Sequence, residues 1–262
     1  MKHPATIRTS LLAGRRVLVA GGDGEIGRVI CAVLSDEGAD VAVAGIDGDS
    51  ATTFAATLST GPNRAAGYQA DLTNQDAARD LTERVAGAWG GLDVAINCAG
   101  VLKTSPAEEF DAADWRAVVE TNLTGAFFLS QAAARVMIKN GEGGRIIHLT
   151  SVRAALGLAI GGFAAYGASK AGVHLLVRQL AAEWGKHQIA VNAVAAGFVQ
   201  TALSARAVPD VDASKMVTAR TPLGRVADPR EIANAVAYLA GPRSDFITGQ
   251  VLYVDGGLTA SQ

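Results

Sequence analysis

The stretch 16–30, RVLVAGGDGEIGRVI, decides the fold, because a glycine-rich turn joins a short apolar run to a helix. The run 16–20 has the length and β-branched content of a buried strand. Backbone N–H groups at the start of a helix bind anions without basic side chains, and glycine permits close backbone approach. The turn therefore predicts a phosphate site, although it also carries two acids, Asp23 and Glu25.

The same strand-then-helix order recurs along the chain. Apolar runs bounded by Gly, Asp, Asn or Thr occur at 16–20, 40–44, 66–70, 92–97, 144–150, 189–195 and 250–254. Helix-like stretches between them include 26–37, 74–88, 108–137, 164–185 and 228–240. This alternation predicts a doubly wound α/β fold, with a mostly parallel seven-stranded sheet and helices on both faces. In such folds a ligand binds at the carboxyl ends of the strands.

Composition narrows the class of protein. The 262 residues are 49% hydrophobic, enough for a large core, and the net charge is only −2. No basic stripe supports a nucleic-acid partner, and no apolar stretch approaches the ~18 residues that span a membrane. The two cysteines and four histidines lack metal-ligand spacing, so we expect no metal site and no disulfide scaffold. We expect a cytoplasmic protein.

The chain reads as one domain. Residues 1–13 look like an N-terminal extension, and 14–262 show no linker or break in composition. The segment 198–226 has weak periodicity, which fits a substrate loop beside a ligand or an ordinary surface loop.

Tyr166 and Lys170 are the pair best suited to proton transfer. They lie four residues apart in a helix-like stretch, so on a helix they share a face, about 40° apart. A free tyrosine has a pKa of about 10, and a neighbouring ammonium lowers it. Such pairs also occur on ordinary helix surfaces, so the spacing alone decides nothing.

The glycine turn resembles the Thr-Gly-x-x-x-Gly-x-Gly signature of short-chain dehydrogenases/reductases. Ala20 stands for the usual Thr and Glu25 for the middle Gly, while Gly21, Gly24 and Gly27 keep a three-residue spacing. The resemblance implies the Rossmann fold and a nicotinamide dinucleotide as cofactor. We expect Gly24 to approach the phosphates and the Glu25 side chain to turn away from them.

The family's Asn–Ser–Tyr–Lys tetrad also has counterparts in order. Asn122 lies in ETNLTGAFF, Ser151 follows the run IIHLT, and Tyr166 and Lys170 lie in YGASK. By resemblance, Tyr166 is the general acid/base and Lys170 lowers its pKa while holding the nicotinamide ribose. Ser151 would polarise the carbonyl or alcohol, with Thr150 as an alternative, and Asn122 would hold a water that feeds protons to Lys170.

The resemblance implies a wider set of cofactor contacts at strand ends. These are Gly21, Gly24, Glu25, Ile26, Gly27, Asp47, Asp71, Leu72, Asn97, Ala99, Gly100, Tyr166, Lys170, Gly197, Val199 and Thr201. Two substitutions depart from the family pattern: Cys98 replaces an Asn, and Ala196 replaces a Pro. We expect Cys98 to be a buried thiol and not a nucleophile, and Ala196 to loosen its turn.

The residues after the second strand favour NAD and leave NADP open. An acid about twenty residues past the glycines binds the ribose 2′-OH of NAD, and Asp47 lies twenty residues after Gly27. Where NAD-using family members carry Asp this chain has Gly45, and Ile46 stands where NADP-using members often carry Arg.

The activity implied is reversible hydride transfer between nicotinamide and a secondary alcohol or ketone. Sugars or polyols, 3-oxoacyl thioesters and cyclic alcohols are candidate substrates. The expected pocket comprises Val101, Leu102, Val152, Arg153, Phe163, Phe198 and the segment 202–218. Arg153 could meet a carboxylate or polyol, or lie solvated at the rim. The alternative is a catalytically inactive nicotinamide-binding sensor or scaffold, and the family resemblance implies a homotetramer.

Overall fold

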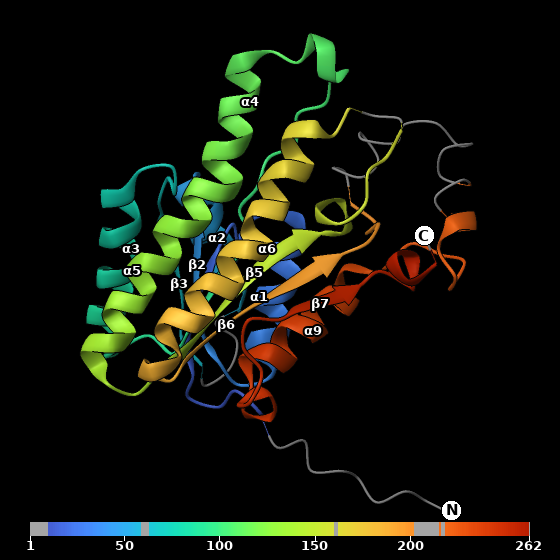
Figure 1. Cartoon of the computed structure of the whole chain (residues 1–262). Helices are drawn as coiled ribbons and strands as arrows, with labels where there is room; N and C mark the ends of the chain where they lie inside the picture. The colour runs from blue at the N-terminus through green and yellow to red at the C-terminus, as the bar shows by residue number, and fades with distance from the viewer. Residues whose placement is uncertain (1–9, 59–62, 160–161, 202–214, 216–217, 262) are drawn as a thin grey trace, which may run out of the picture.

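A seven-stranded parallel sheet forms the centre of the protein (Figure 1). The computed structural model describes residues 10–58, 63–159, 162–201, 215 and 218–261. Every strand pair is parallel, in the spatial order β3-β2-β1-β4-β5-β6-β7. The strands are β1 (Arg16–Ala20), β2 (Asp40–Gly45), β3 (Ala65–Gln69), β4 (Val94–Asn97), β5 (Gly144–Ser151), β6 (Ile189–Ala196) and β7 (Val251–Val254). The predicted doubly wound fold is confirmed.

Helices cover both faces of this sheet (Figure 1). They are α1 (Glu25–Asp36), α2 (Gly48–Leu58), α3 (Gln75–Trp89), α4 (Ala112–Val119), α5 (Gly125–Asn140), α6 (Ala164–Trp184) and α9 (Pro229–Ala240). On β1, Leu18 packs with the core of α3, α5 and α6, whereas Val17 and Val19 pack with the core of α1 and α9. Burial on both faces explains why the run 16–20 is continuously apolar.

The order of the strands reverses beside β1, and this places the site. Strand β1 pairs with β2 on one side and with β4 on the other. The chain therefore leaves β3 at one edge and crosses back to β4 beyond β1. A crevice at such a reversal, outside the carboxyl ends of the strands, is the usual ligand position in doubly wound sheets.

The expected helix 108–137 is divided in two. Asp111 caps α4 by accepting hydrogen bonds from the N–H groups of Ala113 and Asp114. A π-helical turn, Glu120–Thr124, then joins α4 to α5. Single π turns of this kind occur often at functional sites, and this one contains Asn122.

Part of the expected N-terminal extension packs onto the domain. Leu12 is fully buried, and its N–H donates a hydrogen bond to the Glu37 carbonyl, while residues 1–9 lie outside the described residues. In the expected loop 198–226, residues 202–214 and 216–217 also lie outside them. None of the helices in the described ranges is long and apolar enough to cross a membrane.

Candidate active site

The glycine turn at the end of β1 is packed too closely for side chains. Gly21 has a φ of +71°, and a Cβ there would lie 2.6 Å from the Ala99 nitrogen. A Cβ on Gly27 would lie 2.9 Å from the Gly22 Cα. Gly24 is the N-cap of α1 and has no side chain to accept hydrogen bonds from the first N–H groups of that helix. Those groups therefore fit the phosphates of a dinucleotide.

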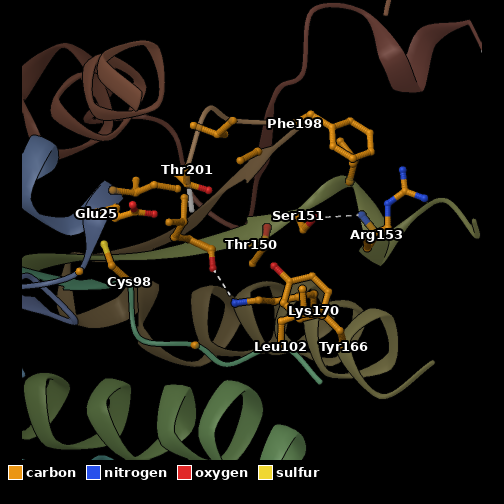
Figure 2. A pocket seen from close by; sticks show the side chains of 18 of the residues that line it. Glu25, Cys98, Leu102, Thr150, Ser151, Arg153, Tyr166, Lys170, Phe198 and Thr201 are labelled. Atoms are coloured by element: carbon orange, nitrogen blue, oxygen red, sulfur yellow. Dashed lines mark hydrogen bonds between the residues drawn. The ribbon is translucent and has the colours of Figure 1, made fainter. Parts of the chain in front are cut away.

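We expected the Glu25 side chain to turn away from this site, but it lies beside it. Glu25 is exposed and is among the side chains that line the cavity in front of the turn (Figure 2). A carboxylate at the first turn of a helix interacts favourably with the helix dipole. The same carboxylate adds negative charge where we expect phosphates.

The acid beside the end of β2 is Asp23. Asp47, the expected ribose ligand, instead caps α2, since its Oδ1 accepts hydrogen bonds of 3.0 Å from the N–H groups of Asp49 and Ser50. A Cβ built on Gly45 would lie only 2.5 Å from Asp23 Cγ. The Asp23 carboxylate thus occupies the space where a side chain of residue 45 would begin.

Arg28 is the basic side chain bonded to this part of the turn. Its Nε donates to the Asp23 carbonyl at 2.7 Å, and Nη2 donates to Ser50 Oγ at 3.1 Å. The guanidinium also lies 4.7 Å from the centroid of the Phe54 ring. Three neighbours therefore hold the Arg28 side chain across α1 and α2.

Three expected cofactor contacts shape loops and do not line the cavity. Asp71 Oδ1 accepts hydrogen bonds from the N–H and hydroxyl groups of Thr73, and Leu72 is buried. Asn97 Oδ1 accepts a hydrogen bond of 3.1 Å from the Ala99 N–H at the end of β4. The hydrogen bonds of Asp71 and Asn97 fix the backbone that follows β3 and β4.

Cys98 lines the cavity as a protonated thiol. Burial raises its pKa to about 12, and the charge of Lys170 opposes this rise only in part. A thiol with this pKa carries almost no thiolate at neutral pH. This pKa supports the prediction that Cys98 is not a nucleophile.

Asn122 clamps the loop after β4 to α6. Its Oδ1 accepts a hydrogen bond of 2.8 Å from the Val101 N–H, and its Nδ2 donates to the Val101 carbonyl at 3.0 Å. The same Nδ2 lies 3.1 Å from Ser169 Oγ, and Ser169 in turn donates to the Tyr166 carbonyl. The Asn122 amide therefore positions two walls of the site. Ser169 links it to Tyr166, and we did not predict this role of Ser169 from the sequence.

Ser151 and Thr150 direct their hydroxyl groups to different partners. Ser151 ends β5, and its Oγ accepts a hydrogen bond of 3.2 Å from the Arg153 N–H. Thr150 Oγ1 lies 2.9 Å from His174 Nε2 and donates to the Val194 carbonyl. Because the Thr150 hydroxyl is committed to these groups, Ser151 is the better candidate for a substrate contact.

Tyr166 and Lys170 share one face of α6, as their spacing predicted. Lys170 Nζ lies 5.6 Å from the centroid of the Tyr166 ring and donates to the Leu149 carbonyl at 3.1 Å. Burial lowers the pKa of Lys170 to about 8. Burial also raises the pKa of Tyr166, while a hydrogen bond with Ser151 and the charge of Arg153 lower it. The expected effect of Lys170 on the pKa of Tyr166 stays a prediction, which the position of its ammonium 5.6 Å from the ring supports.

The segment after β6 closes the cavity on another side. The Gly197 N–H donates to the Val254 carbonyl, and a Cβ on Gly197 would lie 2.8 Å from the Asp255 Cα. Ala196 is buried and paired with both Ser151 and Val254 across the sheet. We expected Ala196, which stands where the family has Pro, to loosen this turn. Pairing with β5 and β7 holds the Ala196 backbone in the sheet.

These groups line a cavity of about 260 Å³ (Figure 2). The predicted site residues that line it are Gly21, Gly24, Glu25, Ile26, Gly27, Gly100, Ser151, Tyr166, Lys170, Gly197, Val199 and Thr201. The expected pocket residues that line it are Leu102, Val152, Arg153, Phe163 and Phe198, joined by Leu158, which we did not predict. Asp47, Asp71, Leu72, Asn97, Ala99, Val101 and Asn122 are not among the lining residues.

Comparisons with known proteins agree over nearly the whole chain. The family model described as enoyl-(acyl carrier protein) reductase matches residues 20–259. Gluconate 5-dehydrogenase of Gluconobacter oxydans (strain 621H) is 35% identical over 261 residues, which cover 100% of both chains. Cis-4-hydroxycyclohexanecarboxylate dehydrogenase of Sinomonas cyclohexanicum is 37% identical, over 95% of this chain and 98% of that protein.

A solved structure has the same fold. A gluconate 5-dehydrogenase from Burkholderia cenocepacia J2315, in complex with NADP and tartrate, superposes with a TM-score of 0.92 at 32% identity. The match covers 98% of this chain and 100% of that one. Similarity of this extent places the protein in the short-chain dehydrogenase/reductase family of enzymes, which act on CH–OH groups with NAD(P).

Proposed function

We propose that the protein is an NAD-preferring dehydrogenase of small secondary alcohols in which Tyr166 is the general acid/base. The observation that carries this proposal is the convergence of Tyr166, Ser151 and Lys170 on one cavity at the carboxyl ends of the strands, with Lys170 Nζ 5.6 Å from the centroid of the Tyr166 ring. In Figure 2 the Tyr166 hydroxyl points into the cavity, on the side where Ser151 lies. A carbonyl or alcohol oxygen between these hydroxyls would meet both a proton carrier and a polarising group.

The residues present fit a nicotinamide dinucleotide, which when bound supplies the hydride acceptor or donor. The uncapped N–H groups at the start of α1 would hold its phosphates. Ser151 would orient the reacting oxygen, and Tyr166 would take the alcohol proton during oxidation and return it during reduction. Lys170, held by the Leu149 carbonyl, would stabilise the phenolate. A positioned acid/base of this kind contributes roughly 10²–10⁴-fold to a rate.

The environment of Gly45 supports NAD as the preferred cofactor. In dinucleotide-binding sheets an acid near this position accepts the ribose 2′-OH of NAD, whereas an Arg accommodates the 2′-phosphate of NADP. Here the residues 45–47 carry no cation, and the Asp23 carboxylate lies against Gly45. A 2′-phosphate at this place would meet a like charge.

Three of the similar proteins support a compact polyol or cyclic alcohol as substrate, although the family model is named for an acyl-carrier-protein thioester. Two of them are named for gluconate and one for cis-4-hydroxycyclohexanecarboxylate, and each name describes a small alcohol. The side of the cavity beyond the glycine turn is lined by apolar side chains such as Leu102, Phe163 and Phe198. We therefore favour these two classes over a long 3-oxoacyl thioester.

A homotetramer in the cytoplasm remains part of the proposal. Leu175 on α6, Tyr253 on β7 and Phe246, which precedes β7, are exposed apolar side chains. Contacts between copies that bury such side chains would favour association. Light scattering on the purified protein would test for four copies.

Replacement of Tyr166 by Phe separates this enzyme from an inactive sensor. Loss of the hydroxyl should lower turnover by at least 100-fold and leave the dissociation constant of NADH unchanged. Energy transfer from Trp89, Trp115 and Trp184 to NADH measures that constant. Tyr238→Phe, an exposed position on α9, is the matched control. Unchanged turnover in Tyr166→Phe would contradict the proposed role.

A further inference from the structure

Arg153 lies at the end of the cavity opposite the glycine turn. It belongs to the short 3₁₀ turn Val152–Ala154 that follows β5, two residues after Ser151. Figure 2 shows its guanidinium on the side of Phe198, away from Glu25 and Cys98. The Arg153 N–H donates to Ser151 Oγ, so the backbone that carries the guanidinium is fixed relative to the proposed reacting oxygen.

The guanidinium has little to balance its charge within the described structure. Its Nη1 donates to the Gly157 carbonyl at 3.1 Å, and Cζ lies 5.7 Å from the centroid of the Phe198 ring. None of the acidic residues in the described ranges forms an ion pair with it. Burial and the charge of Arg220 both lower the pKa of Arg153. A half-buried guanidinium without a carboxylate neighbour has N–H donors left to bind an anion.

We propose that Arg153 binds a carboxylate of the substrate, so that the enzyme acts on compact hydroxy acids and the corresponding keto acids. The five N–H donors of a guanidinium form a planar fork that matches a carboxylate in two hydrogen bonds. The apolar walls formed by Leu102, Leu158 and Phe163 would contact the carbon skeleton between the two polar ends. This inference rests on the proposed function of Tyr166 and Ser151.

The position of Arg153 favours a short substrate. Two residues of chain span at most about 7 Å, so the Cα atoms of Ser151 and Arg153 are near neighbours. We therefore expect an acid whose carboxylate and alcohol are a few carbons apart to reach both Arg153 and the Ser151 and Tyr166 hydroxyls.

Matched pairs of acid and neutral alcohols test the inference. Xylonate with xylitol, and 3-hydroxycyclohexanecarboxylate with its methyl ester, differ mainly in the carboxylate. We expect the wild type to favour each acid in kcat/KM by about 30-fold or more, because loss of one partner of a buried charge pair has an effect of this size. Arg153→Gln should remove that preference mainly through KM. Arg153→Lys should keep part of it, since the ammonium retains the charge without the fork.

The controls separate this inference from the proposed function. Arg243→Gln removes an exposed arginine outside the cavity and should leave the acid preference as in the wild type. Arg153→Gln should still bind NADH with wild-type affinity, measured by energy transfer, which shows that the fold and the cofactor site are intact. Turnover of the neutral alcohols without the acids, or an unchanged preference in Arg153→Gln, would overturn the inference and leave the proposed function standing. Bound NADH with turnover of no member of either pair would count against both proposals.

Discussion

Lys170 Nζ lies 5.6 Å from the centroid of the Tyr166 ring and is anchored there by the Leu149 carbonyl. The lysine is 6% exposed, so its ammonium has lost most of its hydration. Burial lowers the pKa of Lys170 to about 8, which means that the protein holds a charge at neutral pH at the expense of its own stability. Proteins often accept such a penalty where a charge serves the proposed chemistry.

Replacement of Lys170 by Met should therefore stabilise the fold while it removes turnover. Between pH 8 and 10.5 the unfolded chain binds the lysine proton and the folded chain does not, so wild-type stability rises with pH in this window. Below pH 8 the full penalty applies, and we expect Lys170→Met to gain roughly 1–3 kcal/mol at pH 7. Urea unfolding at pH 7 and at pH 9.5 should show the gain shrinking as pH rises. A variant less stable than the wild type at pH 7 would contradict this account.

His148 makes the free energy of unfolding depend on pH in the acidic range. The side chain is buried on β5, its Nε2 lies 3.0 Å from Ser130 Oγ, and burial lowers its pKa to about 3. Below pH 6.5 His148 binds a proton in the unfolded chain, whereas in the folded chain it does so only below about pH 3. The free energy of unfolding therefore falls as the pH falls. His148→Leu should remove about 2 kcal/mol of the decline between pH 6.5 and pH 5. Ser130→Ala retains the buried histidine and should keep the wild-type slope, and the same slope in His148→Leu would refute the assignment.

Local patterns made the fold and the shared helix face of Tyr166 and Lys170 predictable. The run 16–20 and the turn after it carry their own strand, glycine and helix signals, and Tyr166 and Lys170 lie one helical turn apart. Each of these features depends on residues within a few positions of one another, where spacing determines which groups share a face.

Contacts between segments that are distant in the chain could not be predicted from the sequence. Asp23 lies against Gly45 because β1 and β2 pair in register, with Ala20 opposite Ala44. Spacing after the glycines instead predicted Asp47 as the ribose ligand, but Asp47 caps α2. The pKa of Tyr166 likewise depends on burial, and no spacing between two residues reports how much water a cavity excludes.

Asp23 provides the sharpest test of cofactor choice. No donor among the described residues is bonded to its carboxylate, which lies where a side chain of residue 45 would begin. Asp23→Asn removes the charge and should weaken NADH binding about tenfold, because a hydrogen bond to a charged group contributes about 1.5–3 kcal/mol. NADPH binding should strengthen in the same variant, since a like charge no longer faces the 2′-phosphate.

A double variant and a charge control make this test specific to position. Asp23→Gly combined with Gly45→Asp returns a carboxylate to the same space from β2 and should restore the preference for NADH that Asp23→Gly alone loses. Asp49→Asn changes the net charge equally but lies on the exposed first turn of α2, so it should leave the ratio of the two dissociation constants unchanged. Equal shifts in Asp23→Asn and Asp49→Asn would mean that the general negative field near α2 selects the cofactor. A wild type that binds NADPH more tightly than NADH would contradict this role of Asp23, and Arg28→Ala would then test whether Arg28 binds the 2′-phosphate.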